Sequence, residues 1–276
     1  MFHDPCPMST MLSIVILNYR SAGLVKYCLR GIAAHPPSCP YEIIVVDNAS
    51  RDAALGPVES AHPNVRFVPL AANRGYAAGN NAGLAASTGE YVLILNPDIV
   101  LFKDSINQLI QALERNEQIG MVGPKLLNPD RSLQYSCNRF YSPLTPLARR
   151  TVFGRSARGA ELLRQDLMMD WDHASERDVD WLMGSAVLVR RKALEQVGSL
   201  DERFFLYFED MDWCRRFWAQ QWGVRYIPQS VMVHFHQRLS AQSLWKRHTR
   251  IHIASAIKYF MKHGTQPAMA SRGSAV

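Results

Sequence analysis

Three carboxylates at the start of one predicted helix could perform acid–base chemistry. Glu209, Asp210 and Asp212 open the stretch FEDMDWCRRFWAQQW, directly after the aromatic run RFFLYF. Acids in a first helical turn can simply compensate the helix dipole, which stabilises by roughly 0.3–1 kcal/mol each. That interpretation does not explain three of them behind aromatic residues that would line a cleft. Helix N–H groups also hold the pKa of a carboxyl below about 3.9, so we expect a ready proton acceptor here.

The tripeptide Asn-Pro-Asp occurs twice, in two different settings. At residues 96–98 it interrupts the apolar stretch YVLILNPDIV, which predicts a buried strand. At residues 128–130 it precedes Arg-Ser and an alternating Leu-Gln-Tyr, which predicts an ordinary hairpin turn. An acid at the end of a buried strand is costly unless it is paired, hydrogen-bonded or bound to a metal. The first copy, with Asp98, is therefore a candidate site.

Polar side chains mark the ends of four predicted strands. They are Asn18 with Tyr19, Asp47 with Asn48, Asn96 with Asp98, and His234 with His236. Because such ends lie at one edge of a right-handed parallel sheet, residues far apart in sequence can converge there. Each pair alone has a simpler interpretation: Asp47 could cap a turn, Asn18 and Tyr19 could form one, and His234 could be a hydrogen-bonded core histidine. Their joint placement favours a ligand site.

The stretch NRGYAAGNN has the character of a glycine-rich loop that opens a helix. Gly75 and Gly79 would permit close backbone approach and expose amide N–H groups at the helix start, as a diphosphate cradle requires. The stretch matches neither the dinucleotide fingerprint G-x-G-x-x-G nor the phosphate-binding loop G-x-x-x-x-G-K-[ST]. Hydride transfer and ATP hydrolysis therefore lose their main support.

The composition is that of a folded protein of 276 residues, 47% hydrophobic, with a net charge of +7. Five scattered cysteines without C-x-x-C spacing indicate neither a disulfide framework nor a zinc site, so we expect reduced thiols and a cytoplasmic protein. The first ten residues lack the apolar core of a signal peptide, and no window reaches the roughly 18 apolar residues of a membrane span.

Strand and helix signals alternate through the first half, which predicts an α/β fold with a mostly parallel central sheet flanked by helices. Strands are expected at 12–19, 41–50, 65–70, 90–101, 179–191 and 224–236, and helices at 22–35, 73–88, 104–116, 192–198 and 209–223. Residues 139–177 are irregular and read as an excursion that could cover a cleft. We expect an extension (1–11), one domain (12–238, with halves 12–119 and 120–238) and a tail (239–276).

These stretches together resemble the inverting family 2 glycosyltransferases with a GT-A fold, and in particular their bacterial rhamnosyltransferase-like branch. The matching segments are SIVILNYRS, EIIVVDNASRD, NRGYAAGNNAGLAASTGEYVLILNPDIVL, GPKLLNPDRSLQ, VDWLMGSAVLVRR, LDERFFLYFEDMDWCRRF and MVHFH. They occur in the order of that family and cover roughly residues 12–238. The resemblance implies transfer of a sugar, expected to be rhamnose from dTDP-rhamnose, to a glycan or polyprenyl-diphosphate-linked acceptor in cell-surface polysaccharide synthesis.

The resemblance also implies roles for the polar strand ends. Residues expected to bind the nucleotide sugar are Asn18, Tyr19, Asp47, Asn48, Asn73, Gly75, Asn80 and Asn96. Residues 96–98 resemble the D-x-D metal motif of the family with Asn in place of the first Asp. Asp98 would then be the main acidic ligand of Mg²⁺ or Mn²⁺, completed by His234 or by His236 on the same strand face.

The implied reaction is a single in-line displacement. By resemblance Asp210 is the base that deprotonates the acceptor hydroxyl, with Glu209 beside it. The stretch around Trp181, Met183, Gly184 and Ser185 would border the acceptor and donor sugar, together with Asp212.

The C-terminal segment is strongly basic. No Asp or Glu follows Asp212, whereas ten Lys and Arg residues do. The stretch SLWKRHTRIHIASAIKYFMKH predicts a basic amphipathic helix that lies on an anionic membrane surface or docks on its own domain or on a twin subunit in a homodimer. No established motif supports nucleic-acid binding. A non-catalytic nucleotide-sugar-binding partner is the alternative to an enzyme, because the metal motif lacks its first Asp.

Overall fold

The computed structural model describes residues 11–149, 151–235 and 247–265. His236 and half of the predicted tail (239–246 and 266–276) therefore lie outside the described residues. The strands are β1 (Leu12–Asn18), β2 (Tyr41–Asp47), β3 (Val65–Pro69), β4 (Tyr91–Leu95), β5 (Ile99–Leu101), β6 (Ile119–Leu127), β7 (Leu133–Gln134), β8 (Cys137–Asn138), β9 (Arg177–Asp178), β10 (Trp181–Leu182), β11 (Ala186–Arg190) and β12 (Gly223–His234). The helices are α1 (Ala22–Ala34), α2 (Leu55–Ala61), α3 (Gly75–Ala86), α4 (Ser105–Glu114), α5 (Leu144–Ala148), the 3₁₀ turn η1 (Val152–Arg155), α6 (Ala157–Asp166), α7 (Arg191–Val197), α8 (Glu209–Ala219) and α9 (Arg247–His263).

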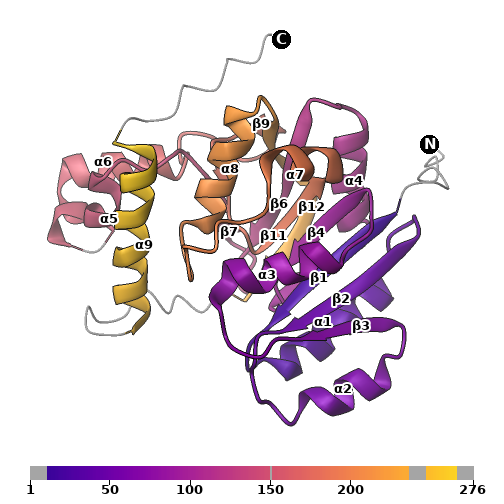
Figure 1. Ribbon diagram of the computed structural model, residues 1–276. Coiled ribbons are helices and arrows are strands. Elements are labelled where there is room, and N and C mark those ends of the chain that lie inside the picture. Colours follow the sequence, from indigo (N-terminus) through magenta and orange to yellow (C-terminus); the bar gives the residue numbers. More distant parts are fainter. Residues whose placement is uncertain (1–10, 150, 236–246, 266–276) are drawn as a thin grey trace.

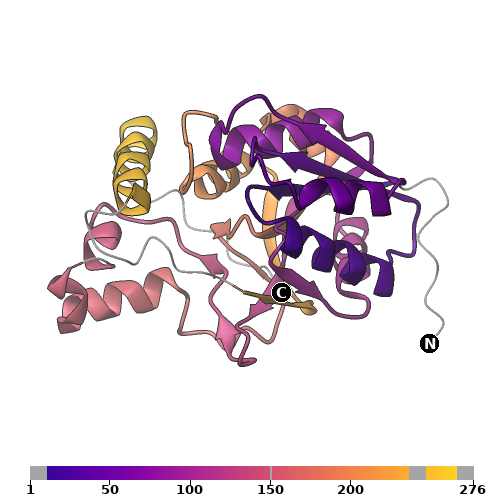
Figure 2. The same cartoon turned by 90° about the horizontal axis from the view of Figure 1, so that it is seen from below.

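One twisted sheet runs through the described residues in the order β3-β2-β1-β4-β11-β6-β12-β5, with helices on both faces (Figures 1 and 2). The pairs β3-β2, β2-β1, β1-β4 and β6-β12 are parallel, whereas β11 and β5 run antiparallel to their neighbours. This confirms the predicted α/β fold. Because β4 of the first predicted half pairs with β11 of the second, the two halves share one continuous sheet.

The two Asn-Pro-Asp copies differ as their flanks predict. The prediction of one strand over 90–101 is wrong, because β4 ends at Leu95 and the tripeptide carries the chain to the far sheet edge. There β5 pairs with β12, with Ile99 opposite His234. The second copy is the predicted turn: Asn128 N donates to Ser132 O at 2.9 Å, and β7 folds back on β6.

Tight packing fixes the helices that carry site residues. Every residue of β4 is buried, as expected for a central strand covered on both faces. Helix α3 lies close against β1 because Gly79 faces Leu17 and Gly83 faces Val15, where a Cβ atom would clash. On the other face, α4 buries Leu109, among other apolar residues. These contacts place the start of α3 at the sheet edge where β4 ends.

The excursion 139–177 contains α5, η1 and α6, which the sequence did not predict. Its Pro and Gly residues obscure the helical pattern, but buried polar contacts hold the segment together. The Thr145 hydroxyl donates to Asp166 Oδ2 at 2.7 Å, and Arg139 N donates to the Asp166 carbonyl at 2.8 Å. In both views the segment lies beside α9 (Figures 1 and 2).

Helix α9 is docked on the rest of the chain, which was one of the two predicted alternatives. Tyr259 is fully buried, and the Ser255 hydroxyl donates to the Leu206 carbonyl at 2.9 Å. Lys258 Nζ donates to the Arg203 carbonyl at 2.8 Å. Within the part of the chain that the structure describes, no helix combines the length and the apolar character needed to span a bilayer.

Candidate active site

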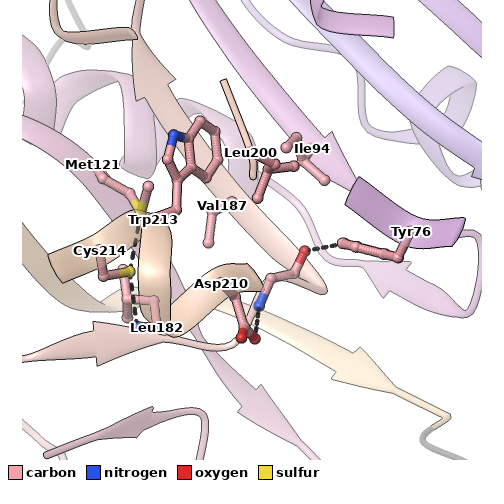
Figure 3. Close-up of a pocket in the computed structure, with 10 residues that line it drawn as sticks. Tyr76, Ile94, Met121, Leu182, Val187, Leu200, Asp210, Trp213 and Cys214 are labelled. Carbon is pink, nitrogen blue, oxygen red and sulfur yellow. Dashed lines mark hydrogen bonds between the residues drawn. The ribbon is translucent and has the colours of Figure 1, made fainter. Parts of the chain in front are cut away.

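The carboxylate of Asp210 lies at the edge of the sheet, held by backbone N–H groups. Its Oδ2 accepts a hydrogen bond from Gly184 N at 3.1 Å, and its Oδ1 accepts one from Met211 N at 2.9 Å. On the other side of this backbone segment, the Tyr76 hydroxyl donates to the Gly184 carbonyl at 2.6 Å (Figure 3). The same hydroxyl lies 3.1 Å from Asn96 Oδ1. The starts of α3 and α8, the end of β4 and the loop before β11 therefore meet at this point.

Burial sets the pKa of the two adjacent carboxyls at the start of α8. It raises the pKa of Asp210, even though the N–H groups of Gly184 and Met211 act in the opposite direction. It raises the pKa of Glu209 well above its usual range, and the negative charge of Asp210 adds to the effect. The predicted depression by helix N–H groups is therefore wrong, because the cost of burying charge exceeds their stabilisation. A raised pKa makes Asp210 a stronger proton acceptor than an exposed aspartate.

Asp212, expected near the bound sugar, instead holds α9 to α8. Its fully buried carboxylate accepts from Arg216 Nε at 2.9 Å and lies 2.5 Å from Lys262 Nζ and 2.6 Å from His263 Nε2. Burial alone would raise the pKa of Asp212, but hydrogen bonds from His263 and Lys262 and the charge of Arg216 hold it below its usual range. We call these four residues the Asp212 cluster.

Asp98, on the loop between β4 and β5, carries another carboxylate, which faces His234. Asp98 Oδ1 lies 3.5 Å from His234 Nε2, and His234 Nδ1 lies 2.7 Å from Gln134 Oε1. A partner on Nδ1 fixes the ring so that Nε2 points toward the carboxylate. Within residues 11–149, 151–235 and 247–265, no group of three or more His, Cys, Asp or Glu residues could hold a metal ion. The pair offers one carboxylate and one imidazole, so further ligands would have to be oxygens of a bound molecule or water.

Asn18 and Asp47 form one polar cluster at the ends of β1 and β2. Asn18 Nδ2 donates to Asp47 Oδ1 at 2.8 Å and to Ser50 Oγ at 3.2 Å. Asn18 Oδ1 accepts from the N–H of Ser21 at 3.1 Å and from its hydroxyl at 2.9 Å. Asn18 is fully buried, whereas the following Tyr19 is 40% exposed.

Asn48 joins the end of β2 to the start of α3. Its Nδ2 donates to Asn73 Oδ1 at 3.1 Å and to the Gly75 carbonyl at 3.0 Å, and Asn73 Oδ1 also accepts from Gly75 N at 2.9 Å. Tyr76 N donates to the Phe205 carbonyl at 2.7 Å. The expectation that this helix start exposes its amides is therefore wrong for Gly75 and Tyr76. Glycine is required at position 75 for a different reason: its φ is +92°, and the Phe205 backbone lies where a Cβ would project.

Four predicted site residues each have a buried side-chain oxygen with no hydrogen-bond partner in the described part of the chain. They are Asn80, Asp98, Ser185 and Glu209. Unpaired buried oxygens are uncommon in folded proteins, and each calls for an explanation. The negative charges of Glu209, Asp210 and Asp98 all add to the effect of burial in raising the pKa of Tyr76, so these groups share one neighbourhood. Glu209, Asp210 and Asp98 therefore lie near one another around Tyr76.

Trp181 has a different role from the other predicted residues. Its Nε1 donates to the Arg139 carbonyl at 2.8 Å, and its ring lies edge-on to Tyr141 at 5.3 Å. The indole therefore packs on the first residues of the excursion 139–177.

Sequence reasoning missed Tyr76, Gln134 and Ser50. Tyr76 lies inside the glycine-rich stretch, but an aromatic residue in a helix start carries no chemical signal of its own. Gln134 and Ser50 become site residues only through contacts 100 and 32 positions away, with His234 and Asn18. No local pattern reports such contacts.

The chain is similar in sequence to known glycosyltransferases. A family model described as Glycosyl transferase family 2 matches residues 13–175. An N-acetylglucosaminyl-diphospho-decaprenol L-rhamnosyltransferase of Mycobacterium tuberculosis is 30% identical over 246 residues, covering 82% of this chain and 76% of the relative. The rhamnosyltransferase WbbL of Escherichia coli is 23% identical over 261 residues, covering 91% of this chain and 93% of the relative.

Solved structures share the fold at lower identity. A mannosyltransferase of Pyrobaculum calidifontis, in complex with GDP-Man and Mn²⁺, aligns with a TM-score of 0.60 and 18% identity, covering 96% of this chain and 69% of that one. TarS of S. aureus, residues 1–349 in complex with UDP-GlcNAc, aligns with a TM-score of 0.56 and 15% identity, covering 83% and 59%. These alignments confirm the predicted GT-A fold.

Proposed function

We propose that this chain, which belongs to glycosyl transferase family 2, is an inverting transferase that moves rhamnose from dTDP-rhamnose to a lipid-linked N-acetylglucosamine. Membership in the family and a rhamnosyltransferase relative at 30% identity support this donor and acceptor. The observation that carries the proposal is the position of Asp210. Its carboxylate is fixed by Gly184 N–H at the sheet edge, beside the residues expected to bind the donor.

Asp210 is proposed as the base that takes the proton of the acceptor hydroxyl. Its two N–H partners orient the carboxylate, and burial raises its pKa, which strengthens it as a proton acceptor. Glu209 lies next to it with an unpaired buried oxygen and a pKa well above its usual range. We therefore assign the proton-accepting role to Asp210. Glu209 is proposed to remain neutral and to form hydrogen bonds with hydroxyl groups of the acceptor or the donor.

The nucleotide sugar is proposed to lie along the ends of β1, β2 and β4. Asn18, Asp47 and Tyr19 would hold the base and ribose, because they form a connected polar cluster next to an exposed aromatic ring. Asn48, Asn73, Gly75 and Asn80 would border the ribose and diphosphate, and Asn96, Gly184 and Ser185 the sugar. The unpaired oxygens of Asn80 and Ser185 support this placement.

Asp98 and His234 fit Mg²⁺ or Mn²⁺ as two of its ligands. Asp98 Oδ1 is buried without a hydrogen-bond partner and faces His234 Nε2, and both ligand types suit these ions. A bound divalent cation would offset negative charge on the departing nucleoside diphosphate. Asn96 would contribute at most a neutral oxygen, which its contact with the Tyr76 hydroxyl already engages.

The direct test is transfer by the purified protein. Incubation with dTDP-rhamnose, Mn²⁺ and a synthetic N-acetylglucosaminyl-diphospho-lipid should give a product one deoxyhexose heavier, with inverted anomeric configuration by NMR. Asp210→Asn should lower turnover by roughly 10²–10⁴-fold. Asp178→Asn is the matched control, since Asp178 pairs with Arg225 on β12 at the sheet edge. Binding of dTDP-rhamnose without turnover on any acceptor would refute the enzyme and favour the non-catalytic partner.

A further inference from the structure

An apolar groove lies between α5 and α9, two helices that are neighbours in both views (Figures 1 and 2). It encloses about 580 Å³ and is lined mainly by Pro143, Pro146, Leu147, Ile253, Ile257 and Met261. The side chains of Met261, Ile257 and Leu147 are 81%, 56% and 49% exposed. An exposed apolar cluster of this kind marks a binding surface, and its volume lies within the roughly 300–1,000 Å³ of small-molecule sites. We call it the α5–α9 groove.

The orientation of α9 leaves this apolar face outward. Its polar and aromatic side docks on the body, through buried Tyr259, the Ser255 hydroxyl and the Lys262 ammonium. The basic side chains Lys258 and Lys262 therefore bond to the chain's own oxygens. The sequence suggested a basic outer face, and Arg250 and Lys258 are exposed, but Ile257 and Met261 are turned to solvent beside them. The groove is thus not required to attach α9.

The groove borders the proposed active site. His252 lines the groove, and its ring contacts the Phe208 ring at 5.1 Å between centroids. Phe208 directly precedes Glu209 at the start of α8 and contacts Tyr141, whose ring packs on Trp181. The Tyr141 hydroxyl is buried without a hydrogen-bond partner in the described residues. One layer of aromatic side chains therefore separates the groove from the catalytic carboxylates.

The charge around the groove suits an anionic ligand. No Asp or Glu occurs from Pro143 to Ala160 or anywhere after Asp212. Exposed Arg149 lies over the Tyr141 ring at 4.7 Å, on the side of the groove that faces the active site. Arg250 on α9 is also exposed. An apolar groove flanked by basic segments without acidic residues matches a lipid that carries a diphosphate.

We infer that the α5–α9 groove holds the polyisoprenoid chain of the lipid-linked acceptor, with its diphosphate near Arg149 and its sugar toward Asp210. This inference rests on the proposed function for the acceptor class. A concave site of this volume fits a single flexible chain, whereas the flat surface of a bilayer would cover only its rim. The exposed residues of the groove would guide the chain from the membrane to the active site.

The test compares acceptors that differ only in their lipid. N-acetylglucosaminyl diphosphates esterified to ethanol or to farnesol are assayed below their critical micelle concentrations. We expect kcat/KM to be higher for the farnesyl compound by on the order of 100-fold, which corresponds to burial of about three to four methylene groups at roughly fourfold each. The double variant Ile257→Gln with Met261→Gln should lower this ratio at least tenfold. The control Leu24→Gln changes an exposed leucine on α1, far from the groove, and should leave the ratio unchanged.

A second measurement does not depend on transfer. Farnesyl diphosphate alone should bind the wild-type protein in calorimetry and bind the double variant at least tenfold more weakly. If no acceptor is turned over but this binding difference is found, the proposed function fails and the groove stands. If the wild type turns over both acceptors equally, the groove inference fails alone. A third outcome would overturn the groove inference in favour of a face that contacts the bilayer. The double variant would then lose binding to acceptor-free phosphatidylglycerol vesicles, while its kcat/KM ratio between the farnesyl and ethyl acceptors would stay unchanged.

Discussion

The Asp212 cluster provides a direct test of how α9 is held. Replacing Asp212 with Asn keeps the size of the side chain but removes the negative charge that faces Arg216, Lys262 and His263. The pKa of Asp212 is lowered in the folded protein, so its stabilisation is present above its usual pKa of 3.8 and is lost as pH falls through the folded value. At pH 7 the contribution of the Asp212 carboxylate to the free energy of unfolding is therefore fully present.

The magnitude follows from the burial of each partner. Removing one member of a buried ion pair typically costs about 3–5 kcal/mol. Here Asp212 is fully buried, but the Lys262 side chain is 23% exposed and also pairs with Asp201 at 2.8 Å. We therefore expect Asp212→Asn to lower the free energy of unfolding by about 2–4 kcal/mol, which corresponds to a fall in Tm of roughly 5–10 °C for a protein of this size.

The assay is thermal unfolding at pH 7 combined with hydrogen exchange of α9. The control is Glu202→Gln, which removes the carboxylate paired with exposed Arg74 and leaves the Asp212 cluster intact; an ion pair at the surface contributes about 1 kcal/mol or less. Exchange in α9 should increase only in Asp212→Asn. A fall in Tm below 2 °C together with a raised acceptor KM would refute the reasoning and restore the role beside the sugar that the sequence suggested.

Four further results are expected. The rate of transfer should rise with pH through the raised pKa of Asp210, so kcat should titrate above pH 3.8 in a pH-rate profile, and an acid limb at or below 3.8 would contradict this. Because the pKa of Glu209 is raised in the folded state, stability falls as pH rises from 4.5 through the folded value; Glu209→Gln should therefore raise Tm at pH 7 more than at pH 4. His234→Ala should remove most of the additional rise in Tm that Mn²⁺ gives in the presence of dTDP, and an unchanged metal increment would exclude His234 as a ligand. Gly75→Ala should destabilise by more than about 2 kcal/mol because of its positive φ and the Phe205 backbone, whereas Gly23→Ala in α1, with open space around it, should stabilise slightly in the same denaturation assay.

The alternating pattern of the first half was sufficient to predict the α/β fold and the edge where its polar residues meet. Asn18 and Asp47 end β1 and β2, and Asn96 follows β4 directly, so their position depends only on strand order and on parallel pairing. The first Asn-Pro-Asp copy was likewise recognisable, because a polar triplet between apolar runs has no place inside a strand. The path of the chain after this tripeptide could not be predicted. Only the tertiary fold shows that the chain leaves β4 and joins the opposite edge of the sheet.

The sequence could not predict the direction of the Asp210 pKa shift or the contacts of Asp212, because both depend on burial in the folded protein. A helix N-terminus is visible in sequence, but the depth of Asp210 depends on residues packed around it from β4, β11 and α3. The role of Asp212 depends on Lys262 and His263 of α9, which contact it from 50 and 51 positions later in the chain. The irregular excursion hid α5 and α6 for a similar reason, since Asp166 and Thr145 contact each other only once the segment is folded.

Docking of α9 should also matter for catalysis, through Phe208. Tyr207 and Phe208 both have positive φ, of 70° and 69°, which is costly for residues other than glycine. The rings of His252 and Tyr259 on α9 pack against Phe208 at 5.1 and 5.6 Å and hold it in this conformation. Phe208 is the residue from which α8 starts, so its backbone sets the direction in which Glu209 and Asp210 emerge. Release of α9 by Asp212→Asn should therefore lower kcat as well as Tm, whereas Gly23→Ala should leave kcat unchanged.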